Sequence, residues 1–195
     1  MLSAAHVPAQ GTPPAKDLLL ARQIFLALRP NVAKEIKLTD AQRSKVEDAF
    51  HGGLEVEGER VRIMITGDDS MDDMAAAGMK VLEASQKARL KEIWLQESGS
   101  LAILEATVAR DLGVTKEQAA KADKIAESVA SEIMDLFREM SGDHEEAAKK
   151  VNGFRDSARK QFDGLLTEDQ RKQLETMKGK AFKLRAKDGG SLESA

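Results

Sequence analysis

One segment of this chain occurs twice, 76 positions apart, and this repetition constrains the fold more than any other feature. Residues 32–42 align with residues 108–118 without a gap, and four of the aligned positions are identical: two apolar residues, a Thr and a Gln. The same shift pairs further identical residues: Leu28 with Leu104, Arg62 with Arg138 and Met64 with Met140. A match at a fixed period predicts an internal duplication, so the chain is expected to contain two copies of one structural unit.

A short motif, an apolar residue followed by Thr-x-x-Gln, marks the ends of these units. Its three copies consist of nine residues: Leu38, Thr39, Gln42, Val114, Thr115, Gln118, Leu166, Thr167 and Gln170. The spacing is that of a capping box, in which the Thr hydroxyl and the Gln side chain accept backbone N–H groups at a helix start, behind an apolar staple residue. Residues 82–86 form a degraded copy without the Thr. The nine residues are therefore predicted to have structural roles at helix N-termini.

The composition favours helices throughout. The chain of 195 residues has no Cys and only 4% aromatic residues, so its core must be built from Leu, Ile, Val, Met and Ala. We predict an all-α fold, an elongated helical bundle of two tandem repeat units, each opening and closing with a capped helix. The first unit is expected over residues 16–100 and the second over 101–187. Residues 1–15 and 188–195 are predicted to be a disordered leader and a disordered tail.

An apolar stripe with helical spacing runs from Ala122 to Leu165. Its mean step is about 3.6 residues, the period of an α-helix, and it continues through the turn-like residues 141–143. One long bent helix and a helical hairpin that reverses at Gly142 both fit. We favour the hairpin, because residues 66–69 in the first unit are also turn-like. A narrow stripe on long charged helices needs a partner surface, so a homodimer is expected.

The motif copies resemble those of a known family. Residues 38–42 (Leu-Thr-Asp-Ala-Gln) and 166–170 (Leu-Thr-Glu-Asp-Gln), each followed by Arg and an amphipathic helix, resemble the LTxxQ motifs of the Spy/CpxP-like periplasmic proteins. Residues 168–182 resemble the C-terminal end of LTxxQ-bearing proteins of planctomycete-type bacteria. The resemblance implies an all-α, elongated, often dimeric envelope protein that acts as an ATP-independent chaperone, a stress-response modulator or a metal-responsive accessory.

Several function classes find no support in the sequence. The formal charge of −3 gives no reason to expect a nucleic-acid partner. The longest apolar run, residues 18–28, is interrupted by Arg22 and is shorter than the roughly 20 residues of a membrane span. Residues 1–14 resemble the stretch that follows an export cleavage site, so a periplasmic or otherwise exported protein is expected rather than a cytoplasmic one. No catalytic or nucleotide-binding motif is present, so we predict no enzymatic activity and no cofactor.

Met140 and His144 are weak candidates for metal ligands, since they lie one helical turn apart if the helix continues. One His supplies too few strong ligands for zinc, and we therefore expect these residues to pack at a helix junction without a metal.

Two segments depart from one-sided amphipathicity and are candidates for binding other proteins. Residues 18–28 are apolar nearly all round, which predicts a helix buried in the core, in a dimer interface or against a client. The basic tail around Phe182 is either solvated or contacts an acidic partner or anionic lipid. The candidate contact residues are Leu18, Phe25, Leu28, Phe182, Lys183 and Arg185. We predict a non-enzymatic, chaperone-like or stress-response protein that binds unfolded or partner proteins; a structural scaffold for assembly, or a metal-responsive sensor, is the alternative.

Overall fold

The computed structural model describes residues 19–58, 60–63, 70–139 and 144–183. The first half of the chain contains α1 (Leu19–Leu28), α2 (Pro30–Glu35), α3 (Asp40–Ala49), β1 (Leu54–Glu57), β2 (Arg60–Ile63), α4 (Met71–Val81) and α5 (Ala84–Ser98). The second half contains a 3-10 helix η1 (Gly99–Leu104), α6 (Ala106–Asp111), α7 (Lys116–Glu139), α8 (His144–Leu165) and α9 (Glu168–Met177). The fold is all-α, as predicted, apart from one two-stranded hairpin.

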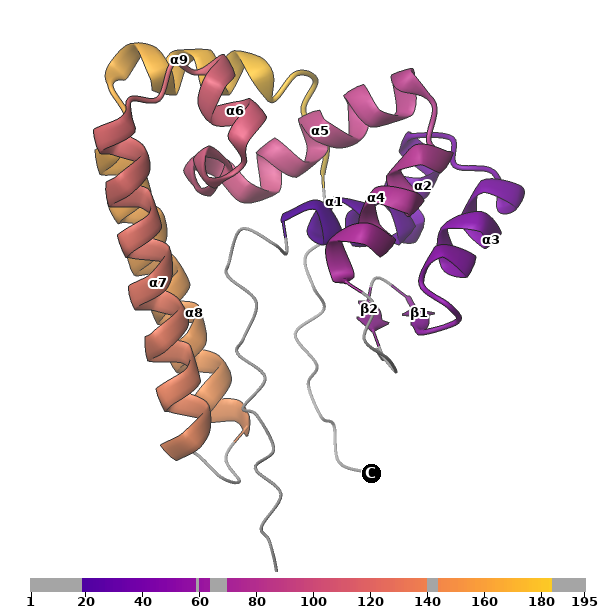
Figure 1. Ribbon diagram of the computed structural model, residues 1–195, viewed down its shortest axis with the longest axis horizontal. Helices are drawn as coiled ribbons and strands as arrows, with labels where there is room; N and C mark the ends of the chain where they lie inside the picture. The colour runs from indigo at the N-terminus through magenta and orange to yellow at the C-terminus, as the bar shows by residue number, and fades with distance from the viewer. Residues whose placement is uncertain (1–18, 59, 64–69, 140–143, 184–195) are drawn as a thin grey trace, which may run out of the picture.

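Helix α1 lies at the centre of the first half and packs against α2, α4 and α5 (Figure 1). Its apolar residues on several sides are buried: Ala21, Ile24, Leu26, Ala27 and Leu28. Gly78 lets α4 approach closely, because a Cβ there would lie 3.1 Å from Cγ1 of Ile24 and 3.5 Å from Cγ1 of Val46. Burial within one chain therefore accounts for the all-round apolarity of this segment.

The hairpin β1–β2 is a feature that the sequence prediction missed. Its strands are antiparallel, with Leu54 opposite Ile63 and Val56 opposite Val61. Alternating apolar residues with β-branched side chains suit a pleated strand better than a helix. Arg62 thus lies in β2, whereas Arg138, its partner at the shift of 76, lies near the end of α7. The ungapped pairing of these residues does not correspond to a shared secondary structure.

Helix α5 connects the two halves and contributes buried residues to the core, among them Leu90, Ile93 and Trp94. It ends at Gly99, whose φ of 57° is in the left-handed region that Gly adopts easily. The chain then continues as η1, which packs against α6 as well as against α7, α8 and α9. This 3-10 helix is therefore one of the places at which the second half attaches to the first.

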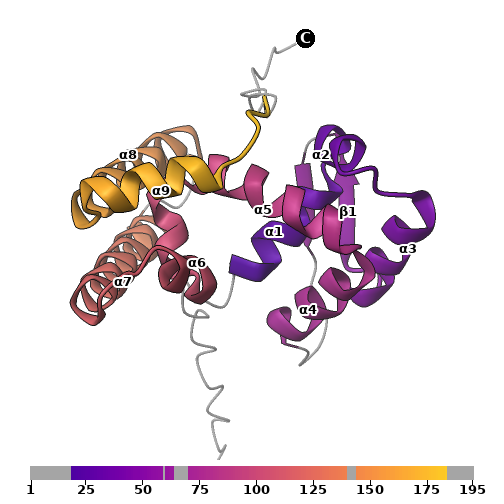
Figure 2. The ribbon, with the colours of Figure 1, turned by 90° about the horizontal axis from the view of Figure 1, so that it is seen from above.

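Helices α7 and α8 form a long antiparallel pair, here called the arm, which extends away from the other helices (Figures 1 and 2). Helix α7 ends at Glu139 and α8 begins at His144, so the stripe is divided between two helices that pack together. The predicted hairpin is confirmed, and the single bent helix is wrong. The buried residues of its seam include Ala122, Leu136, Val151, Ala158 and Phe162.

Helix α9 crosses the base of the arm and contacts α5 and η1 (Figure 1). Leu166 and Leu174, at 4% and 3% exposure, anchor this corner in the core. Among the described helices, none combines the length and apolarity that a membrane crossing requires.

Candidate functional site

The Thr-x-x-Gln motifs form capping boxes, as predicted. The hydroxyls of Thr39, Thr115 and Thr167 each accept the backbone N–H of the Gln three residues later, at 3.2 Å in all three copies. In return, each Gln Oε1 accepts the backbone N–H of its Thr, at 2.9 to 3.1 Å. In the degraded copy, Gln86 likewise accepts the backbone N–H of Glu83, at 2.8 Å, at the start of α5.

The capping glutamines also bind one another in pairs, which the sequence prediction missed. Gln42, at the start of α3, and Gln86, at the start of α5, each donate from Nε2 to the other's Oε1, at 2.9 Å in both directions. Each Gln donates its second Nε2 proton to a backbone carbonyl in front of the other Gln's helix, two residues before the N-cap of that helix. Gln42 donates to Val81 at 3.3 Å, and Gln86 to Lys37 at 3.2 Å.

The second half contains the same arrangement. Gln118 of α7 and Gln170 of α9 exchange hydrogen bonds of 2.8 and 3.2 Å. Gln118 also donates to the Leu165 carbonyl at 2.7 Å, and Gln170 to the Gly113 carbonyl at 3.3 Å. We call each set a paired-glutamine junction. All the amide protons in a junction have acceptors, so these polar groups are buried or half-buried without being left unsatisfied.

The motif residues therefore hold helix starts together. The staple residues Leu38 and Val114 pack against the core, and Leu166 is buried in it. The only sequence signal for the pairing was that each half contains two such Gln positions, 44 residues apart in the first half and 52 in the second.

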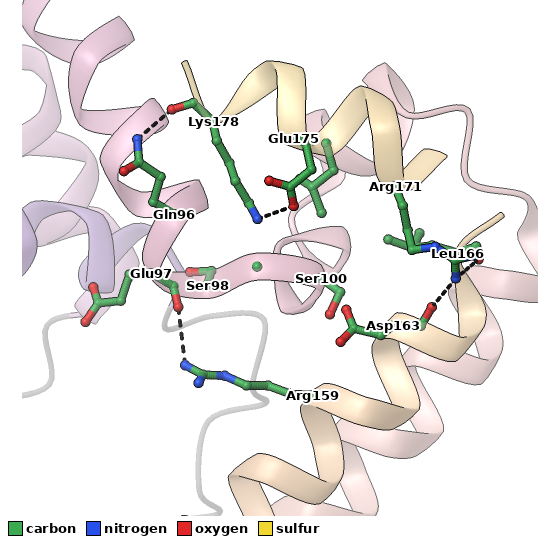
Figure 3. Close-up of a pocket in the computed structure, with 12 residues that line it drawn as sticks. Gln96, Glu97, Ser98, Ser100, Arg159, Asp163, Leu166, Arg171, Glu175 and Lys178 are labelled. Atoms are coloured by element: carbon green, nitrogen blue, oxygen red, sulfur yellow. Dashed lines mark hydrogen bonds and ion pairs between the residues drawn. The ribbon is translucent and has the colours of Figure 1, made fainter. Parts of the chain in front are cut away.

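A cavity of about 320 Å³ lies where the end of α5 and η1 meet α8 and α9 (Figure 3). Its twelve lining residues include Ser98 and the buried Ser100, and no His is among them. The cations around it bind groups of the protein itself. Arg171 donates to the carbonyls of Leu166 and Asp163, at 2.9 and 3.1 Å, and Arg159 donates to the Glu97 carbonyl at 3.3 Å. These bonds join the ends of α5 and α8 to their surroundings.

After α9, residues 178–183 run along α5; we call this segment the strap. Gln96 of α5 donates from Nε2 to the carbonyls of Lys178 at 2.6 Å and Lys180 at 2.9 Å, and its Oε1 accepts the N–H of Phe182 at 2.8 Å (Figure 3 shows the bond to Lys178). Arg89 donates to the Lys180 carbonyl at 2.8 Å, and its guanidinium carbon lies 6.0 Å from the centre of the Phe182 ring.

Two carboxylates hold Arg89 in place. Its Nε donates to Glu35 at 2.8 Å and its Nη1 to Glu92 at 2.6 Å. Partial burial alone would lower the pKa of Arg89, but the hydrogen bonds and charges of Glu92 and Glu35 outweigh it and raise that pKa above its usual value. The guanidinium therefore stays charged, and the face of α5 beneath the strap carries a fixed cation between two anions.

The predicted partner-binding residues lie in different places. Leu28 is fully buried, and Phe25 packs against Phe50 with ring centres 5.6 Å apart, so neither forms an exposed apolar face. Phe182 is half-buried under Arg89, and Lys183 is exposed. Leu18 and Arg185 lie outside the described residues.

Of the two weak metal candidates, Met140 lies outside the described residues, and His144 begins α8 with a side chain that the structure does not describe. Within the described part of the chain, no three His, Asp or Glu side chains are grouped closely enough to hold a metal ion.

In comparisons with protein-family models, curated proteins and solved structures, none matches this chain significantly.

Proposed function

We propose that this protein is a non-enzymatic helical binding protein whose arm takes up a helix or an unfolded segment of another polypeptide, in the manner of an ATP-independent chaperone. This proposal is supported mainly by the absence, among the described residues, of a third helix along the arm. In the first half, α1 packs on α4 and inserts Ile24 against Gly78. In the described part of the second half, α7 and α8 meet η1, α5 and α9 at the base of the arm, and no helix runs along them (Figure 1).

Two helices alone cannot enclose the apolar row between them, because a helix needs a second layer to cover the edges of its stripe. Along α7, Ile125, Val129 and Ile133 remain half-exposed, and Met134 is 37% exposed. Phe154 of α8 is also half-exposed. These residues offer apolar area that a segment of another chain can bury.

Long charged side chains surround this apolar row. Lys121 and Glu132 on α7 and Lys150 on α8 are exposed. Stems of such residues cover apolar surface while their charged ends keep it hydrated, so an empty binding face remains compatible with water.

The resemblance to the LTxxQ-bearing proteins supports the same function and an envelope location. The two paired-glutamine junctions support the further proposal that the halves descend from one duplicated helical unit, because both junctions use the same bonds at corresponding positions.

The proposal is tested by the aggregation of an unfolding client protein, followed by light scattering with stoichiometric amounts of this protein and no ATP. The double variant Val129→Ser, Ile133→Ser should need about thirtyfold more protein for the same suppression, since the two substitutions together remove roughly 2 kcal/mol of apolar contact. The control Lys124→Ser, Glu127→Ser changes exposed residues of the same helix and should suppress as the wild type does. Circular dichroism checks that the variants keep their helices. Equal suppression by both variants would contradict the proposed role of the arm.

A structural role in assembly is the second candidate, with the arm covered by another copy of the chain. Helix α7 carries six acidic and four basic residues and α8 five basic and four acidic, so α7 of one copy and α8 of another attract weakly. Sedimentation would then show a dimer that the Val129→Ser, Ile133→Ser variant dissociates, without suppression of client aggregation.

A further inference from the structure

The strap is held mainly through its backbone. Gln96 accepts the N–H of Phe182 and donates to the carbonyl of Lys180, two residues earlier. A residue in a parallel β-strand makes the same pair of bonds to its neighbouring strand, accepting from one residue and donating to the residue two before it. The side-chain amide of Gln96 therefore acts as a short strand edge for an extended segment.

Backbone bonds of this kind do not depend on the sequence of the segment that they hold, as in peptides that add to a sheet edge. Selectivity comes from the neighbouring side chains. The Phe182 ring lies under the Arg89 guanidinium and packs against the core. The carboxylates of Glu35 and Glu92 lie beside this aromatic position and favour basic residues in the bound segment.

The strap contains a glycine whose backbone conformation other residues rarely adopt. Gly179 has a φ of 59°, and a Cβ there would lie 2.3 Å from the carboxyl carbon of Glu92. The flexible Glu92 side chain can move, but the left-handed backbone strains any residue other than Gly. The side chains of Lys180, Ala181 and Lys183 are exposed, so few contacts besides those of Gln96, Arg89 and Phe182 hold the segment.

We propose that the face of α5 formed by Arg89, Glu92 and Gln96 is a second polypeptide-binding site, for extended segments with an aromatic residue next to basic ones, and that the strap occupies it as an internal competitor. This site is separate from the arm and does not depend on the function proposed for the arm. The alternative, a strap that is permanently fixed to α5, is the outcome that would overturn the proposal.

The experiment uses the full chain in two forms, the wild type and a strap-released variant, Gly179→Val with Phe182→Ala. The probe is a fluorescent peptide with the sequence of residues 176–186, and binding is measured by its anisotropy. A tethered segment competes at an effective concentration of the order of millimolar, so the released variant should bind the peptide at least about tenfold more tightly than the wild type. A peptide with Ala in place of its Phe should bind weakly.

Two control variants test whether the peptide binds at Gln96 on α5. Gln96→Ala in the released variant should weaken binding by about tenfold or more, since three hydrogen bonds are lost. Gln161→Ala, an exposed Gln of α8, should leave binding unchanged. No binding by the released variant, equal binding by both forms, or binding that survives Gln96→Ala would overturn the proposal.

A second measurement keeps the test decisive if the released variant does not fold. The chain has no Cys, so Ala181→Cys in the otherwise wild-type protein allows one environment-sensitive dye to be attached to the strap at an exposed position. Millimolar peptide should displace the strap and change the dye signal with saturation, whereas the peptide with Ala in place of Phe should not. An unchanged signal at millimolar peptide would again overturn the proposal.

Discussion

The helix pairs α3–α4 and α7–α8 start from the same kind of paired-glutamine junction and end in different surroundings. The first pair has helices of 10 and 11 residues, and its apolar side is covered by α1. The second has helices of 24 and 22 residues and, within the described chain, no such cover. The junction thus fixes where the two helices of a pair meet. The length of the helices and the presence of a covering helix decide whether the apolar row between them is buried or exposed.

The same comparison explains where the two halves resemble each other in sequence. The identical Thr and Gln of residues 32–42 and 108–118 lie at the junctions, where side-chain hydrogen bonds require particular groups. The far ends differ, with the strands β1 and β2 in the first half. Residues away from the junctions need only keep an apolar face, which many sequences provide.

The largest expected effect tests whether α1 is what closes the first pair. Leu28→Ala should lower the free energy of unfolding by about 3 kcal/mol, because Leu28 is fully buried and its loss leaves a cavity. Ile133→Ala on the half-exposed row of α7 should cost less than about 1 kcal/mol. Urea unfolding followed by circular dichroism measures both. Equal costs would mean that the arm is covered in solution by something equivalent to α1.

The next effect concerns the junctions themselves. Gln86→Ala and Gln170→Ala should each cost about 2 kcal/mol, since each leaves the amide of its partner without its hydrogen bonds. Removing both members of a pair should cost clearly less than the sum of the single changes. A double-mutant cycle on Gln42 and Gln86, and another on Gln118 and Gln170, measures this coupling. Additive costs in either cycle would show that the pair in that half does not act as a unit.

A smaller effect is expected at the helix caps. Thr39→Ala and Thr167→Ala should each cost about 1 kcal/mol through loss of the N-cap hydrogen bond. Client binding should fall only as far as stability does, because both residues are structural in this account. A variant with full stability and reduced binding would assign the motif to a contact surface.

The smallest effect compares one position in the two halves. Lys37 and Gly113 lie at equivalent sites two residues before the capping Thr, with φ angles of 54° and 63°. A left-handed backbone strains Lys more than Gly, so Lys37→Gly should raise the free energy of unfolding by up to about 1 kcal/mol, and Gly113→Lys should lower it by a similar amount. Thermal unfolding of the two variants measures both changes. A loss of stability in Lys37→Gly would show that Lys37 makes contacts that outweigh the strain.

The sequence predicted the features that depend on neighbouring residues. Helix starts after Thr39, Thr115 and Thr167 follow from a box of four residues, and the structure confirms them. The reversal between α7 and α8 was also expected, because residues 141–143 are turn-like in an otherwise regular stripe. These signals are local, so periodicity and capping chemistry were sufficient to read them.

The features that were missed depend on residues far apart in the chain. The hydrogen bonds between Gln42 and Gln86 join residues that no local pattern relates, and those between Gln96 and the strap span more than 80 residues. The hairpin β1–β2 escaped notice because its four-residue strands are too short to interrupt a composition that favours helices. The apolar segment of α1 was recognised, but only the packing of α4 and α5 around it decides between core and interface.

The paired-glutamine junctions consist of neutral amides bonded to one another and to backbone carbonyls. None of these groups gains or loses a proton between strongly acidic and strongly basic solution, and none carries a net charge that dissolved ions could screen. An ion pair in the same place would weaken as acidity or ionic strength changed. The hydrogen bonds that hold the start of each helix pair should therefore have the same strength across a wide range of pH and salt concentration.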